Sequence, residues 1–572
     1  MQQLRQLDVD DKVDGAQVTT GESFGTRFNA FRSFESYADQ VDDTSLGMII
    51  WPGGTFAEVN SGLYGFQHEG LFDPDASGDR PGLAEIFSFA EANGMAVSVV
   101  LPTAIYQDDP ETLKAGATSF FEDVYSGKFG PLPDKLIFEI GNEYYDVFDG
   151  DMVTQSHEYA AVVNSYSDVI TDIEGRFPTD PDQVRFSLQL GKSEEANDAI
   201  LEVLDEDSLL ITDLLTHHRF VFEASGAGNQ VEQATEARDD FNDAIEAAGG
   251  EDANLYLSAY NTASLTRNEA AQQYLETHRG EDVDLGGRGN LEFEQFYQDK
   301  LDVRDHGLEH GENILQIFSE YQPLGVEAAG VYGWDTVHAA RSSLEGTDGE
   351  PYIFAGGATQ DMMAESLIGT TALDWYQDND HRAPEETSIY GFDSADKLVI
   401  FLAAPEFEGD DMKTSISLTG LGETIAVWGE SLTAETPENW HELFDIPDTP
   451  GVDQSPEAET FAVAQREEFT PELKDGSIQI EFSQPGEIVR LTFARTEAGK
   501  AEIEEWHGGA ETDLSGVAEA SWPTSVMGEG ETLADDDEPT EEEAPPDDDG
   551  GGGFPVEALL IGLLLPLLMG GI

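Results

Sequence analysis

Residues 137–145 of the 572-residue chain read IFEIGNEYY. A short, mainly apolar run is followed by a glycine, and two polar residues, Asn142 and Glu143, come directly after it. A run of this length bounded by a turn residue is typical of a strand in a buried parallel sheet. Because the carboxyl ends of the strands of a parallel barrel meet at one mouth, polar residues in this position are candidates for a site there.

Seven further apolar runs lie between Phe24 and about Asp335, and helix-like segments separate them. Eight β/α units in roughly 310 residues predict an α/β fold, a (β/α)8 TIM barrel with insertions, because a plain barrel needs ~250 residues. A doubly wound open sheet is the alternative, but no glycine-rich phosphate loop follows the first strand. The predicted strands are 25–31, 46–51, 95–101, 135–140, 184–190, 210–217, 254–258 and 328–334, and the helices include 80–93, 156–173, 230–248 and 310–321.

Beyond about Gln360 the pattern changes to short strands that alternate apolar and polar residues. This pattern, broken by Gly, Pro and Asp turns, predicts an antiparallel β-sandwich domain after the barrel. Its strands are expected at 397–403, 413–418, 423–428, 477–482 and 487–494. The predicted domains are an N-terminal extension (1–21), the barrel (22–358), the β-sandwich (359–495), a weakly structured connector (496–534), an acidic disordered linker (535–553) and an apolar C-terminal tail (554–572).

The chain is strongly acidic, with 117 Asp and Glu residues, 27 Lys and Arg residues and a formal net charge of −90. This charge repels phosphate backbones, so no nucleic-acid binding is expected. The acidic residues are spread along the whole sequence, which indicates a surface adapted to high salt, where repulsion is screened. The absence of cysteine excludes disulfides, thiolate metal sites and cysteine nucleophiles.

The apolar tail fits three roles: a marginal membrane anchor, a C-terminal export signal or a partner-docking segment. Its uncharged stretch, 558–572, is shorter than the ~20 residues of a membrane span, and Pro566 interrupts it. No apolar stretch follows the charges of the N-terminus, so no cleavable signal peptide is visible there.

Polar and aromatic residues stand at the other strand ends as well. A sugar site requires aromatic rings for stacking and polar groups for hydrogen bonds to hydroxyls. The sequence therefore predicts a carbohydrate site at the barrel mouth. The strand ends concerned are Trp51-Pro52-Gly53-Gly54-Thr55, Leu101-Pro102-Thr103, Gly141-Asn142-Glu143-Tyr144-Tyr145, Thr216-His217-His218, Ala259-Tyr260-Asn261 and Gly333-Trp334-Asp335.

From about Phe24 to Arg495 the chain resembles the clan-A glycoside hydrolases, especially the α-L-arabinofuranosidase and β-xylosidase type of barrel with an appended β-sandwich. The strongest piece of the resemblance is IFEIGNEYY, because an Asn-Glu pair closes the fourth strand in that clan. The resemblance implies that Glu143 is the general acid/base and that Asn142 binds a sugar hydroxyl. On residue types alone, the alternative is that both merely cap the start of a helix.

The chain departs from this family at the seventh strand. A retaining mechanism needs a second carboxylate about 5–5.5 Å from the first, and the family carries it in a Ser-Glu-Tyr-Asn or Thr-Glu-Trp-Asn motif. The matching segment here, 258–261, reads SAYN, so Ala259 occupies the position of the missing nucleophile. By the two-residue period of a strand, Ser258 and Tyr260 are expected to point to the other side.

Three explanations of Ala259 are open: a natural pseudoenzyme that binds carbohydrate, an altered mechanism with another base, or an engineered variant that traps substrate. An inverting mechanism needs carboxyl groups ~6.5–9.5 Å apart, for which Glu58 and Asp335 are the strand-end candidates. The predicted function is a glycoside-hydrolase-like protein that acts on or binds a polysaccharide or oligosaccharide. The alternatives are a non-catalytic carbohydrate-binding or cell-surface protein and a purely structural surface protein.

Further side chains are candidates for sugar contacts. Only one of His217 and His218 can face the mouth, because successive strand residues point in opposite directions. Tyr145, Tyr260 and Trp334 are candidates for stacking or binding. No third ligand with suitable spacing supports a metal site, and no cofactor is expected. Because a polysaccharide ligand lies outside the cell, secretion or a cell-surface location is expected, with a possible membrane or export-machinery contact through the tail.

Overall fold

The computed structural model describes residues 3–514, apart from 29–33, 55–56, 59–64, 68–70, 73–80, 178–179, 181, 280–282, 284, 286–287, 335–339, 382–385, 408–411, 422–423, 475–476 and 510. Within this part of the chain, no helix is both long and apolar enough to cross a membrane. The predicted acidic linker and apolar tail lie outside the described residues.

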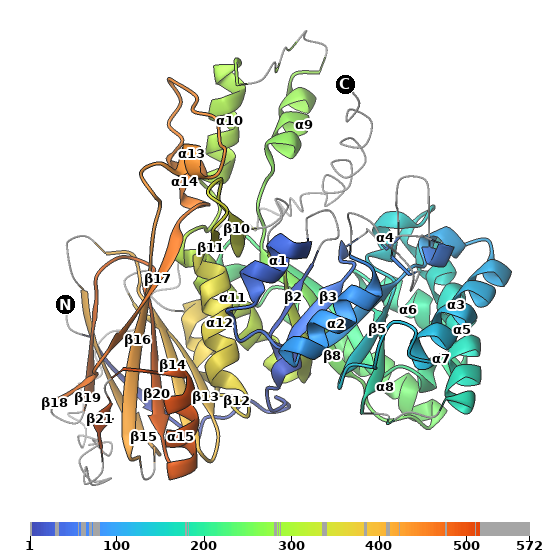
Figure 1. Ribbon diagram of the computed structural model, residues 1–572, viewed down its shortest axis with the longest axis horizontal. Coiled ribbons are helices and arrows are strands. Elements are labelled where there is room, and N and C mark those ends of the chain that lie inside the picture. Colours follow the sequence, from blue (N-terminus) through green and yellow to red (C-terminus); the bar gives the residue numbers. More distant parts are fainter. Residues whose placement is uncertain are drawn as a thin grey trace, which may run out of the picture.

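Eight parallel strands close into a barrel, which confirms the predicted fold (Figure 1). Gly25 of the first barrel strand lies opposite Met48 of the second and Gly330 of the last, and this pairing closes the cylinder. A side chain at Gly25 would press on the backbone oxygen of Ala329 at 2.9 Å, which favours glycine where the first and last barrel strands meet. The strands are β2 (Gly25–Arg27), β3 (Met48–Trp51), β4 (Ala96–Leu101), β5 (Leu136–Ile140), β6 (Val184–Gln189), β7 (Leu214–Val221), β8 (Asn254–Thr262) and β9 (Val326–Tyr332).

Successive strand residues divide between two cores. Met48 and Ile50 of β3 belong to a small cluster built from the barrel strands, which we assign to the inside of the barrel. Ile49 and Trp51 belong to a much larger cluster that also contains the apolar faces of the helices around the barrel. This division is the two-residue period of a strand, and it places polar strand residues of the right phase inside the barrel.

Amphipathic helices cover the outside of the barrel (Figure 1). Asp109 and Asp151 begin two of them, because each side chain accepts a hydrogen bond from the backbone N–H three residues further on. The helices are α1 (Phe34–Val41), α2 (Leu83–Asn93), α3 (Pro110–Tyr125), α4 (Tyr144–Val147), α5 (Met152–Arg176), α6 (Glu194–Val203), α7 (Glu206–Leu210), α8 (Val231–Ala248) and α11 (Leu308–Glu320).

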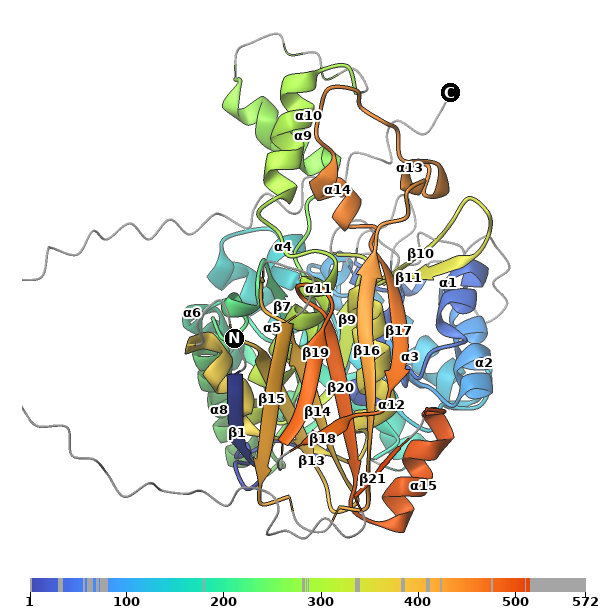
Figure 2. The same cartoon turned by 90° about the vertical axis from the view of Figure 1, so that its left-hand side faces the viewer.

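Two sheets pack beside the barrel as the predicted sandwich (Figure 2). Leu398 and Leu491 of one sheet share a buried cluster with Ile416 and Ile478 of the other. The first sheet has the order β12 (Thr371–Ala372), β13 (Ser388–Asp393), β14 (Lys397–Ala403), β20 (Ile488–Ala494), β16 (Ala426–Glu435), β17 (Val463–Phe469), with β21 (Thr512–Asp513) on β16. The second has the order β1 (Gln3–Asp8), β15 (Met412–Thr419), β19 (Ser477–Phe482), β18 (Glu472–Lys474).

Two segments that the sequence places outside the sandwich contribute to it. Strand β1, in the predicted N-terminal extension, pairs in parallel with β15. The described part of the predicted connector forms helix α15 (Glu497–Trp506) as well as β21, which pairs with β16. Ile503 is fully buried against Trp428 of the sheet. Helix α15 is hard to recognise in the sequence, because the segment is acidic and only a few of its apolar side chains pack against the sheet.

Charged side chains tie the barrel domain to the sandwich. Helix α12 (Ala355–Leu367) presents Asp361 and Glu365, and Arg466 of β17 binds both of them. Arg466 and Arg490 also share Glu430. Four of these five side chains are at most 13% exposed, so the network is largely removed from solvent, and each charged group in it faces at least one opposite charge.

Excursions from the two domains meet above one end of the molecule (Figure 2). Helices α9 (Arg267–Thr277) and α10 (Leu291–Leu301) follow β8, and α13 (Trp440–Leu443) and α14 (Ser455–Glu459) follow β16. Arg288, before α10, pairs with Glu457 of α14 at 3.0 Å. A short hairpin of β10 (Ser343–Glu345) and β11 (Pro351–Ile353) lies between β9 and α12.

Candidate functional site

Strand β5 ends in a sharp turn that presents Glu143 at the barrel mouth. Gly141 has a φ of 82°, and Glu143 itself has a φ of 49°, in the left-handed region that non-glycine residues rarely adopt. The side chain of Glu143 is 30% exposed, so it can reach a ligand. Strain of this kind is typical of functional positions and persists only where the surroundings hold the backbone.

Glu58 provides this support. Its carboxylate accepts hydrogen bonds from the backbone N–H groups of Thr103 (2.7 Å), Ala104 (2.8 Å) and Asn142 (3.0 Å), and from the Thr103 hydroxyl (2.6 Å). Burial raises the pKa of Glu58, although these hydrogen bonds oppose the shift. A carboxylate engaged in this way holds the ends of β4 and β5 together, so the structure gives Glu58 a supporting place.

His218 is the histidine that reaches Glu143. Its Nδ1 lies 3.2 Å from Glu143 Oε1, and its Nε2 lies 2.8 Å from Ser258 Oγ. His217 points the opposite way, stacks on Tyr321 and lies 3.3 Å from its hydroxyl. Burial lowers the pKa of His217 to about 3, so that ring is neutral. Only one of the two histidines faces the mouth, as strand alternation predicts.

The Glu143–His218 contact favours the ionic form of both groups. Burial raises the pKa of Glu143, but the hydrogen bond and the charge of His218 outweigh it, so the pKa lies below its ordinary value. Burial lowers the pKa of His218, but the nearby carboxylates of Glu139 and Glu143, 3.8 Å from Nε2 and 3.2 Å from Nδ1, outweigh it, so the pKa lies above its ordinary value. The geometry thus favours a carboxylate beside an imidazolium at the mouth.

A buried chain of polar groups continues below His218, inside the barrel. Ser258 Oγ donates to Glu139 Oε1 at 3.0 Å. Arg27 Nη2 binds both oxygens of Glu139 at 2.9 Å, and Arg27 Nη1 donates to Asn142 Oδ1 at 2.8 Å. Arg27 and Glu139 are at most 1% exposed. Burial raises the pKa of Glu139, but Arg27 outweighs it, so the carboxyl is held ionised.

The predicted orientation of Ser258 is wrong. Its hydroxyl contacts the inward-facing groups Glu139 and His218. The register of β8 shifts between Leu257 and Tyr260 against β9, and between Thr216 and His218 against β7. An alternation counted from Ala259 therefore fails, because an irregular strand does not keep its two-residue period. Ala259 itself is 1% exposed.

A second carboxyl group lies close to Glu143. Asp146 on α4 pairs with Lys192 at 2.9 Å, and Lys192 Nζ lies 3.8 Å from the centre of the Tyr145 ring. Burial raises the pKa of Asp146, Lys192 lowers it, and the negative charge of Glu143 raises it further, so the pKa lies above its ordinary value. The environment therefore shifts the pKa values of the two carboxyl groups in opposite directions.

Three other predicted sugar-binding residues are buried. Asn142, Tyr260 and Trp334 are each at most 1% exposed. Each has a buried polar atom, namely Asn142 Nδ2, the Tyr260 hydroxyl and Trp334 Nε1, with no hydrogen-bond partner among the described residues. Asp335, the other candidate carboxylate, lies outside the described residues.

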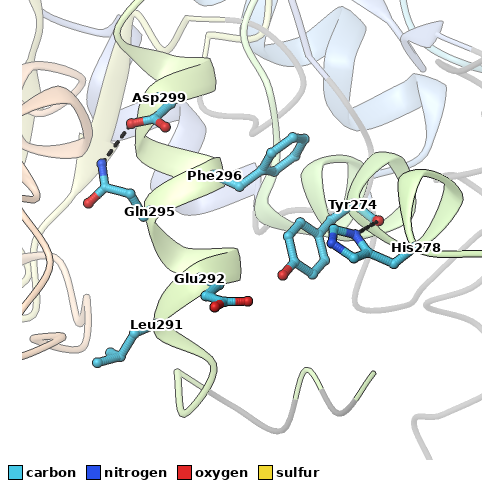
Figure 3. A pocket seen from close by; sticks show the side chains of 7 residues that line it. All are labelled: Tyr274, His278, Leu291, Glu292, Gln295, Phe296 and Asp299. Carbon is cyan, nitrogen blue, oxygen red and sulfur yellow. Dashed lines mark hydrogen bonds between the residues drawn. The ribbon is translucent and has the colours of Figure 1, made fainter. Parts of the chain in front are cut away.

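A hollow of about 520 Å³ lies elsewhere, between α9 and α10 (Figure 3). None of the predicted site residues lines it, and its lining residues are Tyr274, His278, Leu291, Glu292, Gln295, Phe296 and Asp299. In the described part of the chain, no group of three or more His, Asp or Glu side chains could hold a metal ion.

Sequence reasoning missed Arg27, Glu139, Asp146 and Lys192. A usable signal existed for the first pair, because Glu139 stands within an apolar strand run and a buried charge needs an opposite one. Arg27 lies in another predicted strand of the same barrel. No comparable signal marked Asp146 and Lys192, which come together only through the fold.

No protein-family model matches the sequence, and no curated protein matches it either. Solved structures do resemble it. An α-L-arabinofuranosidase from Thermotoga maritima has 13% sequence identity and a TM-score of 0.53, and the match covers 85% of this chain and 98% of that one. A family 51 α-L-arabinofuranosidase from Bifidobacterium longum has 12% identity and a TM-score of 0.53, over 86% and 99% of the two chains.

A GH51 arabinofuranosidase from Xanthomonas axonopodis pv. citri has 15% identity and a TM-score of 0.50, over 86% and 99% of the two chains. This chain therefore has the barrel-plus-sandwich fold of the GH51 arabinofuranosidases, which confirms the resemblance at the level of fold. At these identities the likeness carries the fold alone, and function has to be argued from the site.

Proposed function

We propose that this chain is a glycoside-hydrolase-like protein that binds a polysaccharide or oligosaccharide at the barrel mouth. In this proposal Glu143 is the acid/base group of the ancestral reaction, and Ala259 leaves the chain without a nucleophile for the retaining route. A methyl group neither attacks an anomeric carbon nor stabilises positive charge on the sugar ring. The protein as it stands is therefore a carbohydrate binder without retaining turnover.

The observation that carries the proposal is a set of buried polar atoms on Asn142, Tyr260 and Trp334 that have no hydrogen-bond partner among the described residues. Buried donors without partners are costly, and sugar hydroxyls are suitable partners for each of them. Asn142 and Trp334 follow the carboxyl ends of β5 and β9, and Tyr260 lies two residues before the end of β8. Tyr145, with Lys192 on its ring, adds an aromatic surface next to Glu143.

The test compares the unmodified chain with Ala259→Glu and Ala259→Gln on aryl arabinofuranosides and xylosides, in high salt. We expect turnover by the glutamate variant alone, because glutamine has the same shape and no nucleophilic carboxylate. Calorimetric titration of the unmodified chain with arabinan and xylan oligosaccharides should show binding. If no variant turns over and no oligosaccharide binds, the proposal is wrong.

Because Ala259 is buried, glutamate there could unfold the chain, and a second measurement avoids this. Azide or formate added to the unmodified chain, with an aryl glycoside that has a good leaving group, supplies an external nucleophile. We expect release of the aryl alcohol that depends on the anion. Glu143→Gln should slow this release most for aryl groups that leave poorly, because those need a proton from Glu143. Release in the absence of any anion would instead show that the chain is itself a hydrolase.

Release of the aryl alcohol without any added anion would favour a second candidate function, a hydrolase of altered mechanism. The observation behind it is the pair of Glu143 and Asp146, whose pKa values shift in opposite directions. In such an enzyme the Asp146 carboxyl is the acid and Glu143 the base. Asp146→Asn would then abolish turnover, whereas it leaves binding by a non-catalytic protein largely unchanged.

We propose that the protein is located at the cell surface or outside the cell, because polysaccharides are found there. Fractionation of the native cells with an antibody to the barrel tests this location. Recovery in the cytoplasmic fraction alone would contradict it.

A further inference from the structure

Glu139 fixes the direction of a hydrogen bond. Its carboxylate is buried against Arg27, whose Nη2 donates to both of its oxygens. An ionised carboxylate only accepts hydrogen bonds. Ser258 lies 3.0 Å from Glu139 Oε1, so the single hydroxyl hydrogen of Ser258 points to Glu139.

The same hydroxyl then fixes the ring of His218. Because Ser258 donates its only hydroxyl hydrogen to Glu139, its oxygen accepts the hydrogen bond at the 2.8 Å contact with His218 Nε2. The ring therefore carries a hydrogen on Nε2 in every protonation state compatible with these contacts. His218 Nε2 also lies 3.8 Å from Glu139 Oε1, which favours the same arrangement electrostatically.

With Nε2 fixed, the 3.2 Å contact between His218 Nδ1 and Glu143 Oε1 has two consistent forms. Either the imidazolium donates from Nδ1 to a carboxylate, or the hydroxyl of a neutral Glu143 donates to a bare Nδ1. Both forms hold one proton on this contact. A neutral His218 ring with its hydrogen on Nδ1 would donate that hydrogen to the Glu143 carboxylate. Glu143 would then have no proton to transfer.

We propose that Ser258 and Glu139 are positioning residues that hold the His218 hydrogen on Nε2, so that the Glu143–His218 contact stores one transferable proton. The inference rests on the proposed function of Glu143 as an acid/base group. On cleavage by the Ala259→Glu variant, the new carboxylate bonds to the anomeric carbon as the glycosidic C–O bond breaks. In the same step the Glu143 O–H bond breaks and an O–H bond forms on the leaving glycosidic oxygen. Glu143 becomes a carboxylate and His218 stays neutral with its hydrogen on Nε2, so the proton balance closes.

Several charged or titratable groups act on His218. Glu143 and Glu139 come from β5 and the turn after it, and Arg27 comes from β2. The remaining two are Asp146 on α4 and the neighbouring ring of His217. The positions of the ring hydrogens are decided by the two direct contacts of the ring, with Glu143 and with Ser258.

The primary test is NMR of the ligand-free chain labelled in histidine, with His218 assigned among the 11 histidines by His218→Gln. We expect the unmodified chain to show a protonated Nε2 at every pH at which it is folded. Ser258→Ala should lose the fixed Nε2–H, give a mixture of tautomers after deprotonation, and shift the ring titration to lower pH. Ser258→Thr, which keeps the hydroxyl, should restore the original behaviour.

Ser366→Ala is the matched control, because Ser366 is fully buried and its hydroxyl bonds a backbone carbonyl on α12. It should leave the His218 signals unchanged. The proposal is overturned if Ser258→Ala leaves the tautomer and titration of His218 as they were. Glu139→Gln should act like Ser258→Ala, and if it fails to fold, the serine variants still decide.

A kinetic readout separates this inference from the proposed function. In the Ala259→Glu background, adding Ser258→Ala should lower kcat, shift the alkaline limb of the pH–rate profile to lower pH, and change KM little. An unchanged profile would contradict a positioning role. If Ala259→Glu shows no turnover, the proposed acid/base role of Glu143 is contradicted. The NMR measurement still tests whether Ser258 and Glu139 hold the His218 hydrogen on Nε2.

Discussion

The ends of β5 and β8 lie on the same barrel mouth and differ sharply in how they are held. At β5, Glu58 supports the turn, Arg27 binds Glu139 and Asn142, and His218 contacts Glu143. At β8, Ser258 contacts Glu139 and His218, but the next residue, Ala259, contributes only a buried methyl group. The comparison teaches that loss of the second carboxylate leaves His218 to set the charge of Glu143, because no like charge from β8 raises its pKa.

The largest loss of stability is expected from a substitution in the buried polar chain below the end of β5. Arg27→Met removes the counter-charge of the fully buried Glu139 and one donor to Asn142. We expect the free energy of unfolding to fall by about 3–5 kcal/mol, as for other buried pairs that lose one partner. Denaturant unfolding followed by tryptophan fluorescence measures it.

The matched control is Lys413→Met, which removes an ion pair whose side chains are 60% and 53% exposed. Its loss should stay below about 1 kcal/mol. Equal losses in the two variants would mean that the polar chain inside the barrel contributes no more than a surface pair.

A smaller effect, with a pH signature, is expected for His218→Gln. The lowered pKa of Glu143 stabilises the fold above its ordinary value of 4.5, and this contribution is lost as the pH falls through the lowered pKa. The raised pKa of His218 stabilises the fold below its ordinary value of 6.5, and this contribution is lost as the pH rises through the raised pKa. The stability difference from the unmodified chain should therefore peak between pH 4.5 and 6.5, at about 1.5–3 kcal/mol.

Melting temperatures of the His218→Gln variant and of the unmodified chain, measured at pH values within and on either side of this range, test the predicted pH dependence. His157→Gln is the control, because His157 is 39% exposed and its partner Glu202 is 73% exposed. Its difference should be small at every pH. A His218→Gln difference that does not vary with pH would show that the Glu143–His218 contact is not ionic.

The smallest effect is expected at β8, where Ala259→Gly sharpens the comparison. Removing one methyl group and adding backbone freedom within a strand costs about 0.5–1 kcal/mol. Thermal unfolding measures the cost, and oligosaccharide binding should be unchanged. A loss of 3 kcal/mol or more, on the order of a buried Leu→Ala change, would mean that the irregular segment of β8 is as tightly constrained as the turn after β5.

The barrel could be predicted from the sequence because its strands are short apolar runs with regular spacing. Predicted strands at 135–140 and 184–190 correspond to Leu136–Ile140 and Val184–Gln189. The strand predicted at 254–258 extends to Thr262, because polar residues after Ser258 continue the pairing beyond the apolar run. Local hydrophobicity marks where a strand begins better than where a ladder of backbone hydrogen bonds ends.

The candidate site was predicted in part. Glu143 and the two histidines were named from their strand ends, but the contact of His218 with Glu143 was not predicted. Ser258 was assigned the wrong direction, since a register shift in β8 is a property of three strands together and leaves no mark in one sequence segment. The contact of Asp146 with Lys192 likewise depends on where α4 lies relative to the end of β6. Tertiary geometry of this kind is decided by packing rather than by local pattern.

The pairing of β1 with β15 has a consequence for the order of events on the ribosome. Leu7 of β1 lies opposite Leu418, so the two partners are separated by the whole barrel. At a synthesis rate of about 5–20 residues per second, β1 waits ~20–80 s for its neighbour. During that interval the barrel can close, while an unpaired strand edge stays open to other chains. Strand β1 can therefore pair with β15 only after the chain has been synthesised as far as that strand.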